Sequence, residues 1–493
     1  MKVLKVLKVS ASLGLCWLLG IGITPAQVLA PQQLEVLALA DAPDLVCPTL
    51  PRKKKPARPV ASPAPVTAEA APLDIPDEQE VEQARAALQG DELGLATIPP
   101  ALGDRPVVSW PPVAPQTPFR VAFWGDSHLA AGFFTQELTR RLGLLPEQVH
   151  SAFVPATMNR AGVRLSVRKS CVSSHWRHES AHAWPAAAQA PGPALVNLLA
   201  TQPGASLAWD LRDAQRAPQY QTVRLLYQQT ETPVRIGLRV DGGAEQALWL
   251  QGPIGPAALQ LSAAQALSTL ELRLIEGPLR IHGVGLPVPA TARLQLDLMA
   301  YPGATVRGWQ NAAPEYLQRW FSAMPPYQLV VLAYGTNEAN EKPFDANAYQ
   351  QTLRQSVGQL RRLFPDSACL LIGPGDRGVL VARARATKKT AHKPPVRASK
   401  PPVGDLLRYS LIHEQVTRIQ QAVGTEMGCQ SWSMLHAMGG VASAYRWVRQ
   451  QPPLMARDLI HFTVPGYQHL AGRFAQDLGW SAQTLWLPPS ATP

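Results

Sequence analysis

The clearest chemical signal in the sequence is a serine that directly follows a strand-forming run. The residues from Val121 to Trp124 are apolar, Gly125 and Asp126 form a turn, and helical spacing resumes after Ser127. A strand that turns into a helix presents the next side chain at the carboxyl edge of a sheet, where open α/β folds bind their ligands. Free N–H groups at the helix N-terminus also favour negative charge. Ser127 is therefore a candidate nucleophile, although Gly-Asp-Ser is also ordinary turn sequence.

Three further pieces of sequence fall at the end of a predicted strand or in a loop beside one. They are Gly303 in Tyr-Pro-Gly-Ala, Asn337 in Gly-Thr-Asn-Glu, and the pair Asp458 and His461 in Asp-Leu-Ile-His. A serine hydroxyl needs a neighbouring imidazole to take its proton, and the imidazole needs a carboxylate to fix its tautomer. We predict that His461 Nε2 accepts the proton of Ser127 and that Asp458 holds His461 Nδ1.

Acyl transfer also needs donors that are in place before the tetrahedral oxyanion forms. The predicted donors are the backbone N–H groups of Ser127 and Gly303 and the side-chain amide of Asn337. Glycine suits position 303 because a side chain could obstruct the approach of substrate to the backbone, and Gly308 is a nearby competitor for this role. Each residue also has a simpler interpretation, as a capping serine, a turn glycine, an Asx-turn asparagine or a solvated loop pair.

The four pieces, in this order, resemble the blocks of the SGNH (GDSL-type) hydrolases, whose catalytic Ser, Gly, Asn and His lie in four separate segments. The resemblance spans about residues 119–160 and 293–480. His128 stands where GDSL has leucine, and Glu338 stands where many members have aspartate, but neither position supplies one of the chemical parts. The resemblance implies an α/β fold with a three-layer α/β/α core around a parallel sheet. It also implies a serine esterase that needs no metal and no cofactor.

A narrower set of features is similar to bacterial peptidoglycan O-acetylesterases. These are GDSH, a long β-rich insertion, YGTNE, the stretch from Ala437 to Gly440 with Trp447, and D-x-x-H-F-T-x-x-G-Y. The resemblance implies removal of the O-acetyl group from C6 of N-acetylmuramic acid through an acetyl-serine intermediate. The implied partner is O-acetylated peptidoglycan or a similar acetylated glycan, and the insertion is expected to resemble a carbohydrate-binding module. The alternatives are an O-acetyltransferase acting on a cell-wall or extracellular glycan and a non-catalytic glycan-binding protein.

The hydrophobic pattern indicates which elements position these residues. Short alternating runs with turn signals between them predict an all-β sandwich over residues 163–292. It is inserted into a hydrolase core made of residues 119–162 and 293–485, where strands alternate with helices and so predict a parallel sheet covered on both faces. The predicted helices are 130–142, 314–322, 346–363, 405–423 and 464–478, and the later core strands are 328–333 and 368–372. The predicted strands of the insertion are 163–169, 206–211, 222–228, 234–240, 247–250, 259–262, 269–275, 279–284 and 293–298.

The N-terminal 30 residues have the pattern of an export signal, with three lysines before the apolar segment Ala11–Ile23 and small residues at Val28–Ala30. The apolar segment is short for a membrane span, which needs ~20 residues. We therefore expect a periplasmic or secreted protein without a stable membrane span after cleavage, an uncleaved anchor being the alternative. Residues 31–118 contain 17 prolines and predict a disordered Ala/Pro-rich tether, with one short helix between Pro76 and Gly90.

The net charge of +11 is concentrated in a few segments. Fifteen basic residues lie in the signal, in 52–58 and in 383–400, which contain no acidic residue, so the rest of the chain carries −4. The basic segment 382–402 predicts an exposed loop, and no nucleic-acid-binding motif is present, so no nucleic-acid partner is expected. The expected mature chain has four cysteines, and export permits disulfides. Cys369 and Cys429 both fall in the C-terminal core and are the first expected pair, although spacing does not determine connectivity.

Two other patterns have simpler explanations. The string from His178 to His182 matches the metalloprotease motif H-E-x-x-H, which requires both histidines on one helix face. Pro185 and the surrounding β-rich sequence argue against a helix, so no metal site is expected there. Aromatic residues of the insertion could stack on sugar rings, but core packing is their default role: Trp176, Trp184, Trp209, Tyr220, Tyr227 and Trp249.

Overall fold

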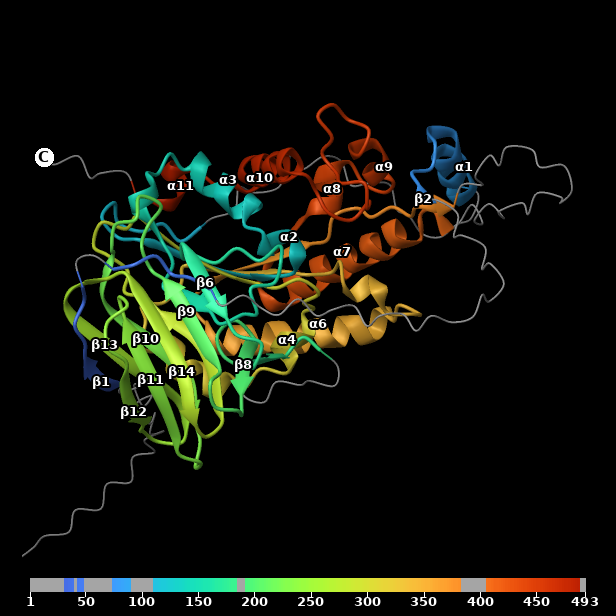
Figure 1. The fold of residues 1–493 in the computed structure, drawn as a ribbon. Coiled ribbons are helices and arrows are strands. Elements are labelled where there is room, and N and C mark those ends of the chain that lie inside the picture. The colour runs from blue at the N-terminus through green and yellow to red at the C-terminus, as the bar shows by residue number, and fades with distance from the viewer. Residues whose placement is uncertain are drawn as a thin grey trace, which may run out of the picture.

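The computed structural model describes residues 31–39, 42–47, 73–89, 110–183, 191–382 and 405–487. A parallel sheet flanked by helices lies beside a unit of two sheets whose strands are antiparallel except where β1 joins β13 (Figure 1). The expected export signal lies outside the described residues, as do 48–72 and 90–109 of the expected tether and the basic loop from residue 383 onward. Among the described helices, none is both long and apolar enough to span a bilayer.

The parallel sheet has the strand order β20-β18-β17-β3-β16-β4. Its strands are β3 (Phe119–Gly125), β4 (Val149–His150), β16 (Leu294–Ala300), β17 (Leu329–Ala333), β18 (Ala368–Gly373) and β20 (Gln430–Ser433). Every neighbouring pair is parallel. All five residues of β17 are buried, as expected for an apolar strand with helices on both faces. The structure confirms the α/β class with a parallel sheet.

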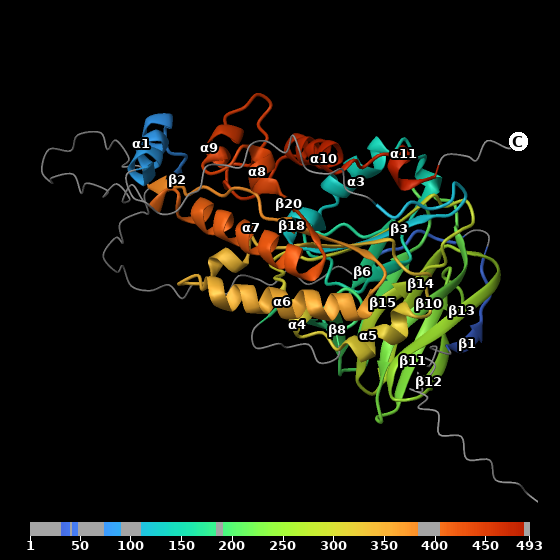
Figure 2. The same ribbon diagram turned by 180° about the vertical axis from the view of Figure 1, so that it is seen from behind.

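Helices cover both faces of this sheet. The helices are α2 (Ser127–Ala130), α3 (Phe133–Arg141), α4 (Arg307–Gln310), α5 (Pro314–Phe321), α6 (Ala346–Leu363), α7 (Arg408–Met427), α8 (Met434–Met438), α9 (Ser443–Trp447), α10 (Val464–Leu478) and α11 (Ala482–Leu485), with 3-10 turns η1 (Pro146–Gln148) and η2 (Glu338–Asn340). Helices α3 and α10 share one hydrophobic cluster with the sheet. Helices α5, α6 and α7 share the other, and Figure 2 shows α6 and α7 side by side. The predicted ranges 346–363 and 464–478 match α6 and α10.

One predicted helix is divided in two. The sequence predicted a continuous helix over 130–142, but the chain breaks at Gly132, which has a left-handed φ of +75°. A Cβ atom at this position would lie 3.2 Å from Arg164 Cδ. The break separates the single turn of α2 from α3, because a left-handed residue cannot continue a right-handed helix.

The second unit contains two sheets with the orders β1-β13-β10-β15-β8-β7 and β12-β11-β14-β9-β6, with β5 also paired to β15. Its strands are β1 (Gln32–Glu35), β5 (Phe153–Pro155), β6 (Lys169–Val172), β7 (Arg177–Ser180), β8 (Val196–Ala200), β9 (Ser206–Asp210), β10 (Tyr220–Gln229), β11 (Val234–Val240), β12 (Gln246–Leu250), β13 (Gly255–Leu267), β14 (Thr269–Glu276) and β15 (Leu279–Gly285). Residues of both sheets, such as Leu225 and Ile236, share one hydrophobic cluster. The predicted strand 163–169 is irregular until Lys169, and the run 293–298 belongs to the parallel sheet as β16.

The prediction of a disordered tether over residues 31–118 is wrong for part of that range. Strand β1 pairs in parallel with β13, because the alternating sequence there can bury Leu34 against the cluster of the β-rich unit. The short helix expected before Gly90 is present as α1 (Glu78–Gln89), next to the two-residue strand β2 (Leu73–Asp74), which pairs with β19 (Val381–Ala382). Helix α1 buries Val81 and Ala84 in the hydrolase core. Prolines are too sparse in these segments to prevent them from packing.

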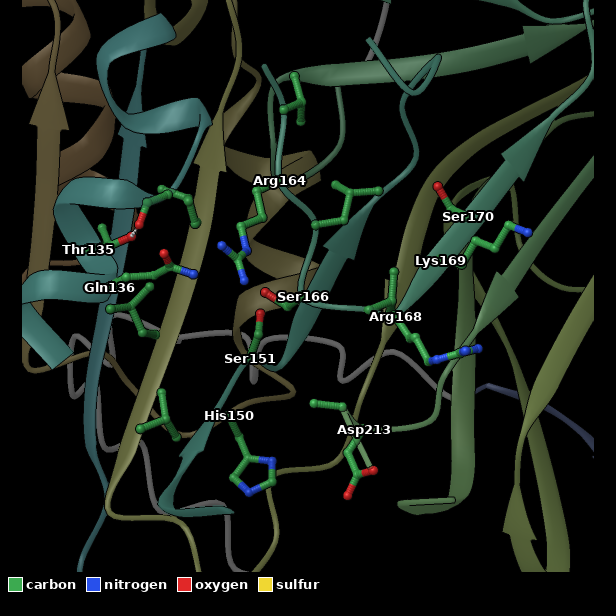
Figure 3. Close-up of a pocket in the computed structure, with 18 of the residues that line it drawn as sticks. Thr135, Gln136, His150, Ser151, Arg164, Ser166, Arg168, Lys169, Ser170 and Asp213 are labelled. Carbon is green, nitrogen blue, oxygen red and sulfur yellow. Dashed lines mark hydrogen bonds between the residues drawn. The ribbon is translucent and has the colours of Figure 1, made fainter. Parts of the chain in front are cut away.

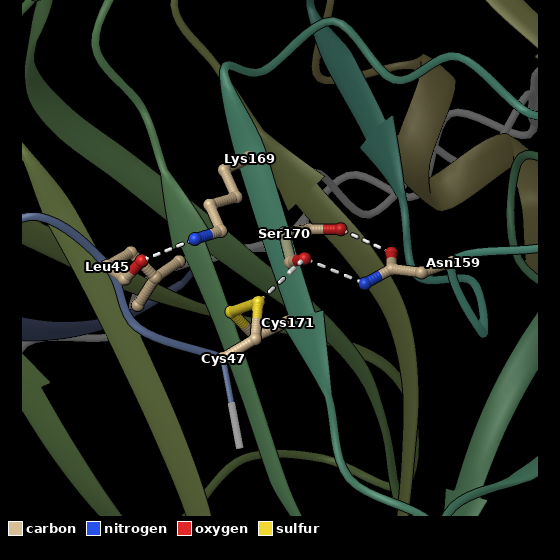
Figure 4. Close-up of a disulfide and its surroundings, with 6 residues drawn as sticks. All are labelled: Leu45, Cys47, Asn159, Lys169, Ser170 and Cys171. Atoms are coloured by element: carbon tan, nitrogen blue, oxygen red, sulfur yellow. Dashed lines mark hydrogen bonds between the residues drawn. A yellow bond between two sulfur atoms is a disulfide. The ribbon is translucent and has the colours of Figure 1, made fainter. Parts of the chain in front are cut away.

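Two disulfides connect distant segments. The expected pair Cys369–Cys429 is confirmed and links β18 to the segment before β20. The other disulfide, Cys47–Cys171, fixes the N-terminal segment to β6 (Figure 4). Lys169 Nζ donates to the Leu45 carbonyl at 2.7 Å beside this bond. The N-terminal segment is therefore held to the β-rich unit by strand pairing, a disulfide and a side-chain hydrogen bond.

Candidate active site

Three of the four predicted pieces follow neighbouring strands. Gly303 follows β16, Ser127 follows β3 and Asn337 follows β17, and these strands are adjacent and parallel. Their carboxyl ends consequently meet at one edge of the sheet. Gly125 permits the close turn, since a Cβ atom there would lie 2.9 Å from the Ala333 carbonyl oxygen.

The fourth piece brings an imidazole to the serine. Ser127 Oγ lies 3.1 Å from His461 Nε2, and His461 Nδ1 lies 2.7 Å from Asp458 Oδ2. With its proton on Nδ1, the imidazole donates to the carboxylate and accepts from the serine hydroxyl. This is the geometry that a serine nucleophile, its base and an orienting carboxylate require.

The loop that carries His461 is fixed by its backbone. Leu459 has a φ of +58°, a conformation that is strained for a branched side chain, but its side chain is fully buried. The Leu459 carbonyl accepts a hydrogen bond from the N–H of Gly378 at 3.0 Å, and the His461 carbonyl accepts one from Ala456 at 2.8 Å. Thr463 caps the following helix α10. Packing of α10 against the core thus determines where the imidazole lies.

Position 303 favours glycine because of its backbone conformation, not because a side chain would clash with its surroundings. It has a φ of +83° and is the third residue of a turn in which the N–H of Ala304 donates to the Tyr301 carbonyl at 3.0 Å. Proline second and glycine third are typical of a type II turn. A Cβ atom at 303 would meet nothing within 4 Å, so the side facing it is open. The competitor Gly308 differs, because a Cβ atom there would lie 2.2 Å from Nδ1 of the buried His182.

Each of the three predicted oxyanion donors keeps at least one N–H hydrogen that no described group accepts. Among the described residues, the N–H groups of Ser127 and Gly303 donate to no other group. Asn337 Nδ2 donates to the Ala304 carbonyl at 2.9 Å, which orients the amide and uses one of its two hydrogens. The second amide hydrogen and the two backbone N–H groups are therefore uncommitted, as the predicted oxyanion donors must be.

The pKa shifts of Asp458 and His461 fit the roles of orienting carboxylate and base. Partial burial alone would raise the pKa of Asp458, but the hydrogen bonds from the side chain and backbone of His461 outweigh it and lower that pKa to about 2. The hydrogen bond to Asp458 raises the pKa of His461 above its ordinary value, despite partial burial. The carboxylate is therefore ionised and the imidazole is a stronger base than a free histidine.

A buried carboxyl beside Asn337, that of Glu338, has a role that was not predicted from the sequence. Glu338 Oε1 accepts from the N–H of Val306 at 2.8 Å and Oε2 accepts from the N–H of Gly335 at 3.0 Å. Glu338 thereby connects the loop after β16 to the loop after β17, the two segments that carry Gly303 and Asn337. Burial raises its pKa to about 7. The only signal in the sequence was its position next to the asparagine.

The two residues that flank Ser127 in the sequence are ionisable and buried. Asp126 is buried and accepts a hydrogen bond from the N–H of His128 at 2.9 Å, and burial raises its pKa to about 6. Burial lowers the pKa of His128 to about 3, so its ring is neutral at physiological pH. The His128 ring centroid lies 5.0 Å from that of Phe462 and 5.7 Å from that of His461. His128 therefore supports the imidazole by packing.

The H-E-x-x-H string does not form the metalloprotease arrangement. Residues 177–180 form strand β7 rather than a helix. His178 stacks on Tyr301, with centroids 4.6 Å apart, and His182 Nδ1 lies 2.7 Å from the Thr305 carbonyl oxygen. Within the described ranges, no group of three or more His, Cys, Asp or Glu residues could hold a metal ion.

Most aromatic residues of the β-rich unit are packed inside it. The buried ones are Trp176, Trp209, Tyr220 and Tyr227. Trp249 is 40% exposed, and the guanidinium of Arg235 lies 5.8 Å from its ring centroid. Trp184 lies outside the described residues. Of the aromatic residues considered from sequence and described by the structure, Trp249 is the one with an accessible ring.

Comparison with known proteins identifies the fold. No protein-family model and no curated protein sequence matches the chain. A solved structure of a peptidoglycan O-acetylesterase aligns with a TM-score of 0.53 and 20% identity, covering 81% of this chain and 95% of that one. The fold of this chain thus resembles that of a peptidoglycan O-acetylesterase.

Two carbohydrate esterases align more weakly. One is a family two enzyme from Clostridium thermocellum in complex with cellohexaose, with 12% identity, 58% and 95% coverage and a TM-score of 0.23. The other is a family two enzyme from Cellvibrio japonicus, with 11% identity, 63% and 98% coverage and a TM-score of 0.23. Scores this low establish nothing about a shared fold.

Proposed function

We propose that the protein is a serine esterase that removes O-acetyl groups from peptidoglycan, at C6 of N-acetylmuramic acid. The observation that carries this proposal is the hydrogen-bonded series from Ser127 through His461 to Asp458, with free donors beside the serine. The fold likeness to a peptidoglycan O-acetylesterase supports the choice of substrate. An export signal at residues 1–30 would place the enzyme in the periplasm or outside the cell, where this polymer lies.

The steps of the proposed reaction follow from the hydrogen bonds that connect Ser127, His461 and Asp458. Ser127 Oγ attacks the acetyl carbonyl carbon while His461 Nε2 takes the hydroxyl proton, and Asp458 stabilises the resulting imidazolium. The oxyanion accepts hydrogen bonds from the N–H groups of Ser127 and Gly303 and from the Asn337 amide. Collapse breaks the bond to the sugar oxygen, which receives the proton from His461. Water, deprotonated by the same imidazole, then releases acetate from the acetyl-serine.

The same residues could transfer the acetyl group to a sugar hydroxyl instead of to water. Solvent exposure of the base and its carboxylate favours hydrolysis over transfer, since the His461 and Asp458 side chains are 44% and 47% exposed. Water can therefore reach the base from the open side of the loop. A site that protects an acyl-enzyme for transfer is expected to exclude water more completely.

The β-rich unit is proposed to hold the glycan. Trp249 offers an exposed ring, which suits stacking on a sugar, and Arg235 lies beside it. Strand β1 and the Cys47–Cys171 disulfide stabilise the unit without contributing to the catalytic edge of the parallel sheet. Binding of the polymer here would raise the local concentration of acetyl groups at Ser127.

Acetate release from O-acetylated peptidoglycan tests the proposal. The Ser127→Ala variant should release no acetate above background while it unfolds at the same temperature as the native protein. Ser322→Ala, a matched change at the exposed end of α5, should keep full activity. Native activity in the Ser127 variant would exclude the mechanism, and formation of acetylated oligosaccharide without free acetate would identify a transferase.

A further inference from the structure

A cleft of about 880 Å³ lies between the hydrolase core and the β-rich unit (Figure 3). The residues Leu296 and Leu298 of β16 line it on the core side, together with Thr135 and Gln136 of α3. The irregular segment 163–168, the start of β6 and the residues after β9 also line it. Most side chains labelled in Figure 3 carry hydroxyl, amide or charged groups, so the cleft suits a polar ligand.

Most of the cations that line this cleft are already paired. Arg168 and Arg212 both form ion pairs with the buried Asp210, at 2.5 and 2.7 Å. Lys169 Nζ donates to the Leu45 carbonyl. These three side chains therefore hold the β-rich unit and the N-terminal segment together and have limited capacity for a ligand.

Arg164 differs from them. It is exposed, and its guanidinium has no hydrogen-bond or ion-pair partner in the part of the chain that the structure describes. Figure 3 shows the side chain in the cleft, between Gln136 and Ser166. Gln136 is also exposed, and its amide has no partner among the described side chains. A guanidinium next to an amide can bind a carboxylate or a peptide group.

The position of Arg164 relates this cleft to the nucleophile. Its backbone N–H donates to the Ala130 carbonyl at 2.8 Å, and Ala130 is the last residue of the helical turn that begins at Ser127. That turn is roughly 5 Å long. The stem of Arg164 passes Gly132, where a Cβ atom would come within 3.2 Å of its Cδ. The break between α2 and α3 thus leaves room for the Arg164 stem, next to the end of the helical turn that begins at Ser127.

We propose that Arg164 is a specificity-determining residue that binds a carboxylate of the muramic-acid substituent, either its lactyl group or the peptide attached to it. This inference rests on the proposed function. It places the carboxylate-bearing substituent of muramic acid in the cleft, a group that a neutral acetylated glycan lacks. The planar guanidinium can bind a carboxylate through two parallel hydrogen bonds. Ser127 then acts on acetyl groups whose sugar also carries a negative charge nearby.

A ratio of activities tests this inference. The kcat/KM for acetate release is measured on O-acetylated peptidoglycan and on O-acetylated chitooligosaccharide, which has no carboxylate. In Arg164→Gln the ratio of the first to the second should fall about tenfold, the loss expected for a charge-assisted hydrogen bond. Arg164→Lys should recover part of the ratio, because it keeps the charge and loses the fork. Arg362→Gln removes the same charge from the exposed face of α6 and should leave the ratio unchanged.

The outcomes separate this inference from the proposed function. A native protein that releases no acetate from peptidoglycan overturns both. A native protein that acts on peptidoglycan, with an unchanged ratio in Arg164→Gln, overturns the arginine assignment alone. An equal loss on both substrates would also overturn it, because the arginine would then support the site rather than recognise charge.

Discussion

Asp458 holds His461 at two points. Its Oδ2 accepts the ring Nδ1 proton at 2.7 Å, and its Oδ1 accepts the backbone N–H of the same residue at 2.9 Å. The carboxylate therefore fixes both the direction of the imidazole and the turn that carries it. A single substitution at Asp458 can separate the electrostatic role from the structural one.

Replacing Asp458 by asparagine should lower kcat for 4-nitrophenyl acetate by roughly 10³–10⁴. The asparagine oxygen can still accept the backbone N–H bonds, but the amide cannot hold the required tautomer and charge. Kinetics and a thermal unfolding curve check this prediction. A large fall in unfolding temperature would instead indicate that the carboxylate acts mainly on the loop.

The pH dependence of native activity should report His461. The imidazole must be neutral to accept the serine proton, and its hydrogen bond to Asp458 raises its pKa above the ordinary value of 6.5. Activity should fall as the pH decreases through that raised pKa. In Asp458→Asn the acidic limb of the kcat/KM profile should move to lower pH, and an unmoved limb would assign it to another group.

Replacing Asn337 by alanine should lower kcat about 10²–10³-fold with little change in KM, because an oxyanion donor acts in the transition state. The variant should remain folded, since the side chain makes one hydrogen bond, to Ala304. Steady-state kinetics with 4-nitrophenyl acetate test this. A rise in KM at constant kcat would make the amide a ground-state binding group.

The two glycines near the site should respond differently to alanine. Gly308→Ala brings a Cβ atom against the buried His182 ring and should reduce the free energy of unfolding by about 1–3 kcal/mol. Gly303→Ala meets open space but has a left-handed φ. It should cost about 1–2 kcal/mol and lose most activity, because the methyl group would stand at the oxyanion donor. Urea unfolding and kinetics on the same samples compare the two variants.

Glu338 should make stability depend on pH. Its pKa is about 7 when folded, against an ordinary 4.5, so the folded state binds the proton more tightly. That contribution is complete below pH 4.5 and is lost as the pH rises through 7, by up to roughly 3 kcal/mol. The excess stability of the native protein over Glu338→Gln should therefore decrease from pH 5 to pH 8 in urea unfolding. If the free energies of unfolding of the native protein and of Glu338→Gln changed with pH in parallel, the carboxyl would not titrate in this range.

The sequence predicted the strands that position the candidate residues Ser127 and Asn337, because each residue follows a regular apolar element. Apolar runs predict β3 and β17, and the residues after them, Ser127 and Asn337, come together because parallel strands end at one edge. Helices α6 and α10 have clear amphipathic spacing and were predicted with their observed ends. Local pattern was sufficient for α6 and α10, each of which packs through one periodic face without interruption.

What the sequence did not predict depends on contacts between distant segments. Strand β1 pairs with β13 across more than two hundred positions, and its own short sequence lies between prolines. The role of Glu338 arises only when the loops after β16 and β17 are adjacent. The break at Gly132 brings α2 and α3 together at a left-handed residue against which Arg164, a residue of another segment, packs. Such features follow from tertiary packing, which overrides local preference.

The separation of Ser127 and His461 by 334 positions has a consequence for biosynthesis. No fragment that ends before the loop of residues 456–461 contains both the hydroxyl and its base. If Ser127 and His461 act as proposed, a nascent chain that has not reached this loop is therefore inert toward esters. On the proposed mechanism, esterase activity begins only after the segment through His461 has been synthesised and folded against Ser127.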